Sequence, residues 1–90
     1  MKAYGIAKYN EDAKKWELIK YYRTFRDALE DITFERVIAV YQNGKVYTKE
    51  KVPFELMYQW TKILMTKDLT KKYITKNKDM YLIKEIKIIC

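Results

Sequence analysis

The chain opens with an alternating pattern that predicts a β-hairpin. Residues 2–9 alternate small side chains with larger ones, which is the period of a strand. The small residues that share one face of this strand are Ala3, Gly5 and Ala7. Such a face is typical of a strand that a helix approaches closely. The polar residues 10–14 predict a turn, and residues 16–23, rich in aromatic and branched side chains, predict the second strand.

The clearest helical signal begins at Thr24. Thr24 can serve as the N-cap, and Asp27 three residues later completes a pair that resembles a capping box. Apolar side chains then recur at helical spacing and form a single stripe. The stripe consists of Phe25, Ala28, Leu29 and Ile32. Because isolated helices of this length are unstable, we expect packing against the sheet to hold the helix.

A second hairpin follows this helix. Residues 35–42 predict a strand, and the stretch 37–41 is apolar on both faces, which favours a central position in the sheet. Asn43-Gly44 is the preferred pair for a type I′ turn, because both residues tolerate positive φ. Residues 46–51 return antiparallel and end rich in lysine, which is typical of an edge strand.

The C-terminal part predicts one more helix and one more strand. Pro53 suits the first position of a helix, where its missing N–H costs nothing. The apolar stripe of this helix is Leu56, Met57, Trp60, Ile63 and Leu64, with Trp60 as its main anchor. From residue 66 to residue 73 the pattern loosens into a continuation of the helix or a new short one. Residues 80–89 fit a helix or a strand, and their isoleucines favour the strand.

These elements predict a single small α+β domain over residues 1–90. The order is β-β-α-β-β-α-β, with a mostly antiparallel sheet and the helices packed mainly on one face. Ninety residues leave no room for a second core. We also expect a cytoplasmic protein without membrane contact, because the chain has neither a signal-peptide pattern nor an apolar run of spanning length.

The composition excludes most catalytic chemistry. There is no histidine, which removes Ser-His and Cys-His nucleophiles and most transition-metal sites. The single cysteine, Cys90, cannot form an internal disulfide, and two glycines cannot build a phosphate-binding loop. Asp27, Glu30 and Asp31 cluster at helical spacing, but we interpret them as a solvated acidic face rather than a cation site. The sequence therefore predicts no enzyme, no metal and no cofactor.

The net charge of +7 lies mostly in the second half of the chain. Residues 1–44 hold eight basic against seven acidic residues, and residues 45–90 hold eleven against five. The densest basic stretch contains Lys62, Lys67, Lys71, Lys72, Lys76 and Lys78. A polyanion such as nucleic acid would be attracted to that stretch first. The alternative is that the charge only keeps the protein soluble.

The aromatic content is the second unusual feature. Nine tyrosines and two tryptophans occur in the chain, and six of the tyrosines fall on predicted strands. On an open sheet face, tyrosines would stack on single-stranded nucleic acid or anchor a protein interface. They could equally fill a half-buried sheet with their hydroxyls in water. The candidate contacts are Tyr4, Tyr21, Tyr22, Tyr41 and Tyr47.

Three classes of function remain open. The first is a small basic binding module that contacts nucleic acid or another polyanion through the lysines and the sheet tyrosines. The second is a protein-interaction module, for instance a small virus- or plasmid-encoded inhibitor of a host defence protein, bound to an acidic surface. A carboxylate–metal enzyme is the least supported class. A homodimer through residues 80–89 is a further expectation, because a C-terminal strand can pair with another chain.

Overall fold

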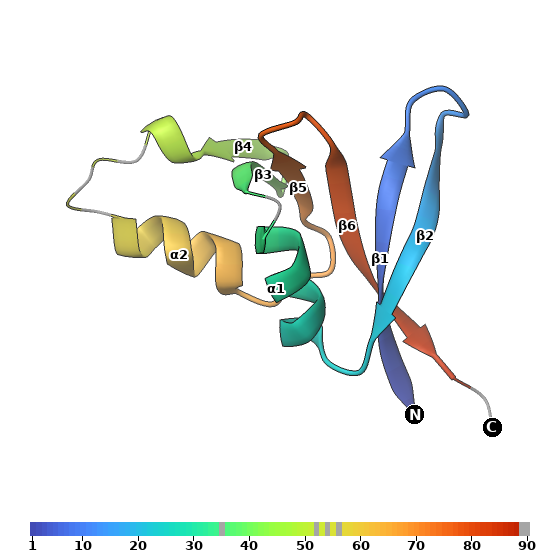
Figure 1. Ribbon diagram of the computed structural model, residues 1–90. Helices are drawn as coiled ribbons and strands as arrows, with labels where there is room; N and C mark the ends of the chain where they lie inside the picture. Colours follow the sequence, from blue (N-terminus) through green and yellow to red (C-terminus); the bar gives the residue numbers. More distant parts are fainter. Residues whose placement is uncertain (35, 52, 54, 56, 89–90) are drawn as a thin grey trace.

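A computed structural model describes residues 1–34, 36–51, 53, 55 and 57–88 (Figure 1). Within these residues the elements follow the order ββαββαββ. Their bounds are β1 Lys2–Asn10, β2 Lys15–Tyr22, α1 Phe25–Phe34, β3 Val37–Gln42, β4 Lys45–Thr48, the 3-10 helix η1 Lys49–Lys51, α2 Met57–Met65, β5 Lys72–Thr75 and β6 Met80–Lys87. Neither of the two α-helices in this described part has the length and apolar character needed to cross a membrane.

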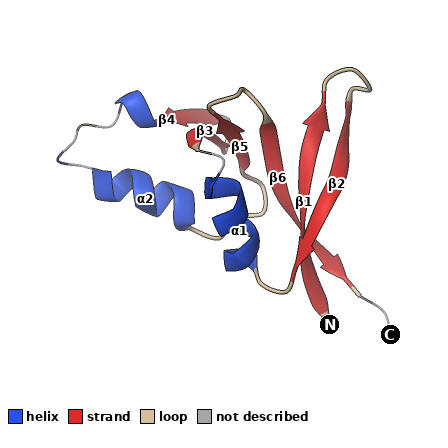
Figure 2. Cartoon of the chain, in the orientation of Figure 1, coloured by secondary structure: helices blue, strands red, loops and turns tan. Residues whose placement is uncertain are grey.

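The strands form one antiparallel sheet in the order β2-β1-β6-β5-β3-β4 (Figure 2). β1 pairs with β6 along nearly its whole length, from Lys2 opposite Lys87 to Lys8 opposite Tyr81. β5 pairs with β6 at only two positions, of which one is Tyr73 opposite Tyr81. The sheet therefore consists of two three-stranded halves that meet at a short seam. Its outer strands are β2 and β4.

Both helices pack on the same face of this sheet and bury one core. Ile6 of β1 and Ile83 of β6 lie opposite each other beneath α1, and Trp60 anchors α2 over the other half. The core cluster is Ile6, Phe25, Ala28, Leu29, Ile32, Val37, Val40, Trp60, Tyr73, Tyr81 and Ile83. The predicted α+β class, the antiparallel sheet and the one-sided helices are confirmed.

Local signals in the sequence also proved reliable. The Thr24 hydroxyl accepts a hydrogen bond from the Asp27 amide at 3.1 Å, so Thr24 caps α1. Asn43 and Gly44 have φ of 52° and 77°, as a type I′ hairpin requires. β3 lies between β5 and β4, which confirms its interior position.

The region after Trp60 differs from the prediction. No helix covers residues 66–73; α2 ends at Met65, and Lys72 begins a sixth strand, β5. The carboxylate of Asp68 accepts hydrogen bonds from the amide and hydroxyl of Thr70, which favours a turn over helix. α2 also begins at Met57 rather than at Pro53. Of the residues used in the predictions, Glu35, Leu56, Ile89 and Cys90 lie outside the described part.

The small face of β1 was assigned to the wrong neighbours. Tyr4 and Ile6 point toward the helices, since Tyr4 contacts Phe25 and Ile6 belongs to the core. The face of Gly5 points away from both helices and is covered by side chains of the flanking strands. A Cβ at Gly5 would lie 2.8 Å from Leu18 Cδ2 of β2 and 2.8 Å from Ile86 Cδ1 of β6. Glycine is therefore needed here because side chains of both flanking strands occupy the space that a Cβ would take.

Replacing Gly5 tests this packing. We expect Gly5→Val to lower the free energy of unfolding by about 1–3 kcal/mol, because the added methyl groups overlap Leu18 and Ile86. In a Leu18→Ala background the cost of Gly5→Val should be smaller, since one of the two overlapping side chains has been shortened. Urea denaturation of the four proteins of this double-mutant cycle measures both values. Equal costs in the two backgrounds would contradict the packing described here.

Candidate functional site

Alternate residues of all six strands build a sheet face that points away from both helices, and it is called the open face below. Residues paired directly across strands share a face, so the register defines its members. From β2 to β4 they are Trp16, Leu18, Tyr21; Ala3, Gly5, Ala7, Tyr9; Met80, Leu82, Lys84, Ile86; Lys72, Ile74; Ala39, Tyr41; Val46 and Thr48. Large apolar side chains on it remain exposed, among them Tyr21 at 62% and Val46 at 58%.

The charges of the open face have one sign. Its strand positions carry Lys72 and Lys84 and no carboxylate. Glu85, the neighbour of Lys84, points to the opposite face and forms an ion pair with Lys2 at 3.0 Å. The Lys72 ammonium lies 5.4 Å from the centre of the Tyr41 ring, a cation–π distance. The open face therefore combines aromatic rings with positive charge.

Two shallow hollows border this face, and each also includes residues of the helix side. The first has a volume of about 600 Å³ and is lined by Ala7, Trp16, Leu18, Leu69, Leu82, Ile83, Lys84 and Glu85. The second has a volume of about 480 Å³ and is lined by Met1, Lys2, Ala3, Tyr21, Tyr22, Arg23 and Ile88. Both are lined mostly by apolar side chains, which suits flat aromatic or apolar ligand groups. Lys84 and Glu85 border the first hollow, and Lys2 and Arg23 border the second.

The candidate tyrosines divide between the two faces. Tyr21 and Tyr41 lie on the open face and are exposed. Tyr4, Tyr22 and Tyr47 lie on the helix side and pack against the core. The sequence reasoning did not single out Trp16 and Lys84, which share the open face with Tyr21. Alternation alone could not have found them, because their face follows from the residues of β1 that they lie opposite.

The candidate lysines are also dispersed. Lys72 alone of the six occupies a strand position of the open face. Lys67 donates a hydrogen bond to the Tyr4 hydroxyl at 3.1 Å, and its ammonium lies 5.0 Å from the centre of that ring. Lys62, Lys76 and Lys78 are exposed on α2 and on the turn between β5 and β6. The lysine-rich segment therefore does not form one continuous surface.

Lys71 is the exception, because it is only 1% exposed. Its ammonium donates hydrogen bonds to the carbonyl oxygens of Ile63 and Thr66, at the C-terminal end of α2. These carbonyls have no amide partner within the helix, so a buried cation there completes the C-terminal cap. Burial lowers the pKa of Lys71, and the nearby charge of Asp68 opposes that shift. Lys71 is thus a structural residue and is not accessible to a phosphate.

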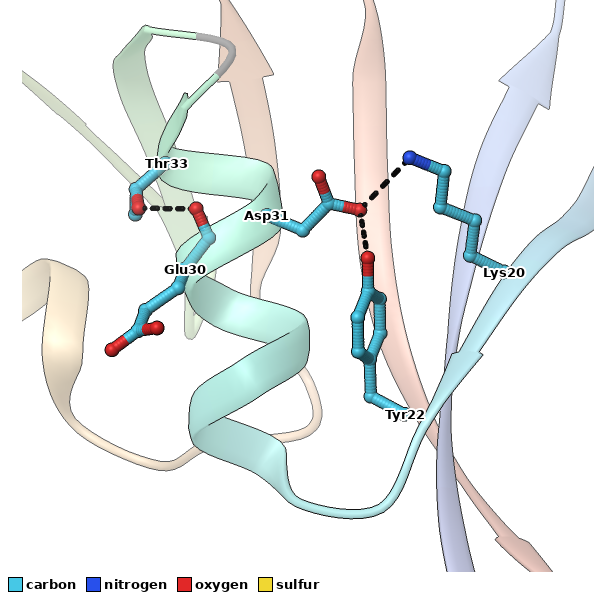
Figure 3. Close-up of polar contacts among 5 residues, drawn as sticks. All are labelled: Lys20, Tyr22, Glu30, Asp31 and Thr33. Atoms are coloured by element: carbon cyan, nitrogen blue, oxygen red, sulfur yellow. Dashed lines mark hydrogen bonds and ion pairs between the residues drawn. The ribbon is translucent and has the colours of Figure 1, made fainter.

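A small polar cluster fixes α1 to β2 (Figure 3). The Tyr22 hydroxyl donates a hydrogen bond to Asp31 Oδ2 at 2.6 Å, and the Lys20 ammonium donates to the same oxygen at 3.2 Å. The Tyr22 hydrogen bond is the main cause that lowers the pKa of Asp31, and Lys20 adds to it. This cluster holds the outer strand β2 in place beside the open face.

The carboxylates of α1 do not converge on a cation site. Asp31 is directed to Tyr22 and Lys20, and Glu30 accepts a hydrogen bond from Arg26 at 3.3 Å. In the part of the chain that the structure describes, no three His, Cys, Asp or Glu side chains lie close enough to hold a metal ion.

Comparison of the chain with protein-family models, with curated proteins and with solved structures finds no match.

Two neighbouring lysines should respond oppositely to substitution. Lys71→Ala should lower the free energy of unfolding by about 2 kcal/mol or more, because it leaves two carbonyl oxygens of α2 without their charged donor. Lys72→Ala should change it by no more than about 0.5 kcal/mol, since the interaction of its ammonium among the described residues is a cation–π contact with the exposed Tyr41 ring. Urea denaturation distinguishes them. Equal losses in the two variants would argue against the capping role.

The lowered pKa of Asp31 predicts an acid-dependent loss of stability. A carboxyl group whose pKa is lower in the folded state stabilises the fold above its unfolded pKa, and this contribution is lost as the pH falls through the folded value. Asp31→Asn should therefore cost about 1 kcal/mol at about pH 7. The difference from the original protein should shrink below about pH 4. Thermal unfolding of both proteins over this range tests it, and a difference independent of pH would contradict it.

Proposed function

We propose that this protein is a non-enzymatic module that binds single-stranded nucleic acid on the open face of its sheet. One observation carries the proposal: the open face combines exposed aromatic side chains with Lys72 and Lys84, and its strand positions hold no carboxylate. Proteins that bind single strands without strong sequence preference pair this kind of basic surface with aromatic stacking platforms. The net charge of +7 would add a general attraction for the same ligand.

The aromatic side chains supply the stacking surfaces. Tyr21 and Tyr41 expose their rings on the two halves of the sheet, and Trp16 lines the larger hollow beside Leu18. Every base has an apolar face that can stack on such rings, whatever its sequence. Lys72 and Lys84 lie between these rings in the strand order, on β5 and β6. They would contact the phosphates that link the stacked bases.

The helix side of the sheet carries charges of both signs. Asp27 and Glu30 are exposed on α1, and so are Arg26 on α1 and Lys62 on α2. The strand positions of the open face carry only Lys72 and Lys84. A polyanion would therefore meet carboxylates on the helix side but none at the strand positions of the open face.

A salt-dependent titration tests the proposal. Fluorescence anisotropy of labelled single-stranded RNA, single-stranded DNA and duplex DNA should show tighter binding of the single strands. Each lysine that neutralises a phosphate contributes about 0.7 to the slope of log K against log salt for a single strand. The variant K72Q/K84Q should therefore reduce that slope by about 1.4. It should also weaken binding to all single strands, whatever their sequence.

The control removes the same charge from the helices. R26Q/K62Q changes two exposed basic residues on α1 and α2, away from the open face. This control should leave the slope nearly unchanged. Equal effects of the two double variants would mean that binding, if present, depends on net charge and not on this face. Absence of binding at low salt would rule the proposal out.

A protein partner is the second candidate, and the apolar hollow of about 600 Å³ is the observation that favours it. Leu18 and Leu82 line it together with Trp16, and such aliphatic side chains contribute more to a protein interface than to base stacking. An inhibitor that covers the nucleic-acid-binding surface of another protein belongs to this class. Absence of nucleic-acid binding would favour it.

A further inference from the structure

A third hollow lies at the end of the sheet where α1 leads into β3, and α2 forms one of its walls (Figure 1). Its volume is about 450 Å³. That volume falls within the range of about 300–1,000 Å³ that is usual for small-molecule sites. The residues that line it are Thr33, Arg36, Val37, Ile38, Lys49, Trp60, Leu64 and Lys76. None of these residues belongs to the open face.

Three basic residues from distant parts of the sequence line this hollow. Arg36 follows the end of α1, Lys49 begins η1, and Lys76 follows β5. None of the other five lining residues is acidic. The ion pairs within the described part of the chain use other basic residues, namely Lys2, Lys8, Lys20 and Arg26. The hollow therefore concentrates three positive charges without a carboxylate among its described residues.

Two of these cations lie directly opposite each other. Val37 pairs with Thr75, and the Lys76 amide donates to the Arg36 carbonyl at 2.9 Å. The antiparallel ladder thus continues for one position beyond β3 and β5, and that position pairs Arg36 with Lys76. Like charges directly opposite each other destabilise a sheet. An anion bound between the two side chains would replace this repulsion with attraction.

The backbone at Arg36 also favours a role for its side chain. Arg36 has a φ of 60°, in the left-handed region where glycine is the usual residue after a helix. Its amide donates to the Thr33 carbonyl at 3.1 Å and so closes the C-terminal end of α1. That closure uses only the backbone, and glycine would provide it with less strain. The guanidinium is therefore not explained by the helix end, whereas its position at the hollow gives it a use.

The remaining walls of the hollow are mainly apolar. Trp60 and Leu64 line it from α2, and Val37 and Ile38 line it from β3. Ile38 is 41% exposed, so a bound carbon group could cover it. Small-molecule sites typically combine such apolar walls with a few charged groups that fix the orientation of the ligand.

We propose that this hollow binds a small phosphate ester. The phosphate group accepts hydrogen bonds from Arg36, Lys49 and Lys76, of which the guanidinium can donate two in parallel. The carbon part packs against Trp60 and Leu64. The C-terminal end of α1 opposes an anion, but it carries only about half a negative charge against three positive ones.

Binding at this hollow requires neither the open face nor a second copy of the chain. The two surfaces share no residue, so the hollow would bind its ligand even if the proposed nucleic-acid binding failed. β6, the strand expected to pair with a second copy, lies inside the sheet between β1 and β5. A monomer therefore contains the complete site.

A nuclear magnetic resonance titration of the unaltered protein tests the proposal. The probes are inorganic phosphate, phenyl phosphate and phenol, which separate the phosphate group from the carbon part. Phenyl phosphate should shift the indole signal of Trp60 and the amide signals of Thr33 and Lys49, and leave the indole of Trp16 on the open face unmoved. It should bind about tenfold more tightly than inorganic phosphate, because its ring buries apolar area. Phenol should not bind measurably.

Charge-removing variants give a second readout. R36Q/K76Q should weaken the binding of phenyl phosphate by about tenfold or more, because two charged donors to the phosphate are lost. K49Q should act in the same direction and leaves the end of the strand pair intact. The matched control R26Q/K62Q also replaces one arginine and one lysine, but neither lines the hollow. It should change the affinity less than about threefold, since exposed charges that do not contact the ligand are screened.

Several results would overturn the proposal, with circular dichroism as the check that each variant is folded. One is a Trp60 signal that neither phosphate probe moves. A second is phenol that binds as tightly as phenyl phosphate, which would mark a purely apolar hollow. Equal losses in R36Q/K76Q and R26Q/K62Q would attribute binding to net charge. Shifts centred on Trp16 would place the phosphate on the open face instead.

Discussion

The alternation of large and small side chains along β1 determines how the rest of the molecule is arranged. Tyr4 and Ile6 face the helices and pack in or against the core beneath α1. Ala3, Gly5 and Ala7 face the other way, and their small side chains leave room for side chains of the neighbouring strands. Because Gly5 has no Cβ, Leu18 of β2 and Ile86 of β6 can both cover it on the open face. Helix packing and strand-to-strand packing are thus separated onto opposite sides of a single strand. The helices need cover only one of these faces.

Much of the fold was predictable because its signals are local. The Thr24 cap, the stripe of α1 and the Asn43-Gly44 turn each depend on residues a few positions apart, and each forms as expected. β5 was missed for the opposite reason. Its four residues show no period of their own, and their strand conformation depends on pairing with β3 and β6. Tertiary pairing of this kind leaves little trace in the local sequence.

The candidate site was harder to predict than the fold. Lysines that are close in sequence, from Lys62 to Lys78, are distributed over α2, a turn, β5 and the next loop, and Lys71 is buried as a helix cap. Tyr21 and Tyr22 are adjacent and therefore lie on opposite faces. Counting residue types identified a basic, tyrosine-rich chain. Assigning each residue to a face needed the strand register and the bulge at Ile19.

The resulting surface favours extended contact over a deep binding pocket. Its hollows are shallow, its charged strand positions carry only lysine, and its aromatic side chains are spread across the sheet. A small ligand would leave most of such a face in water, whereas a flexible chain could follow it from strand to strand.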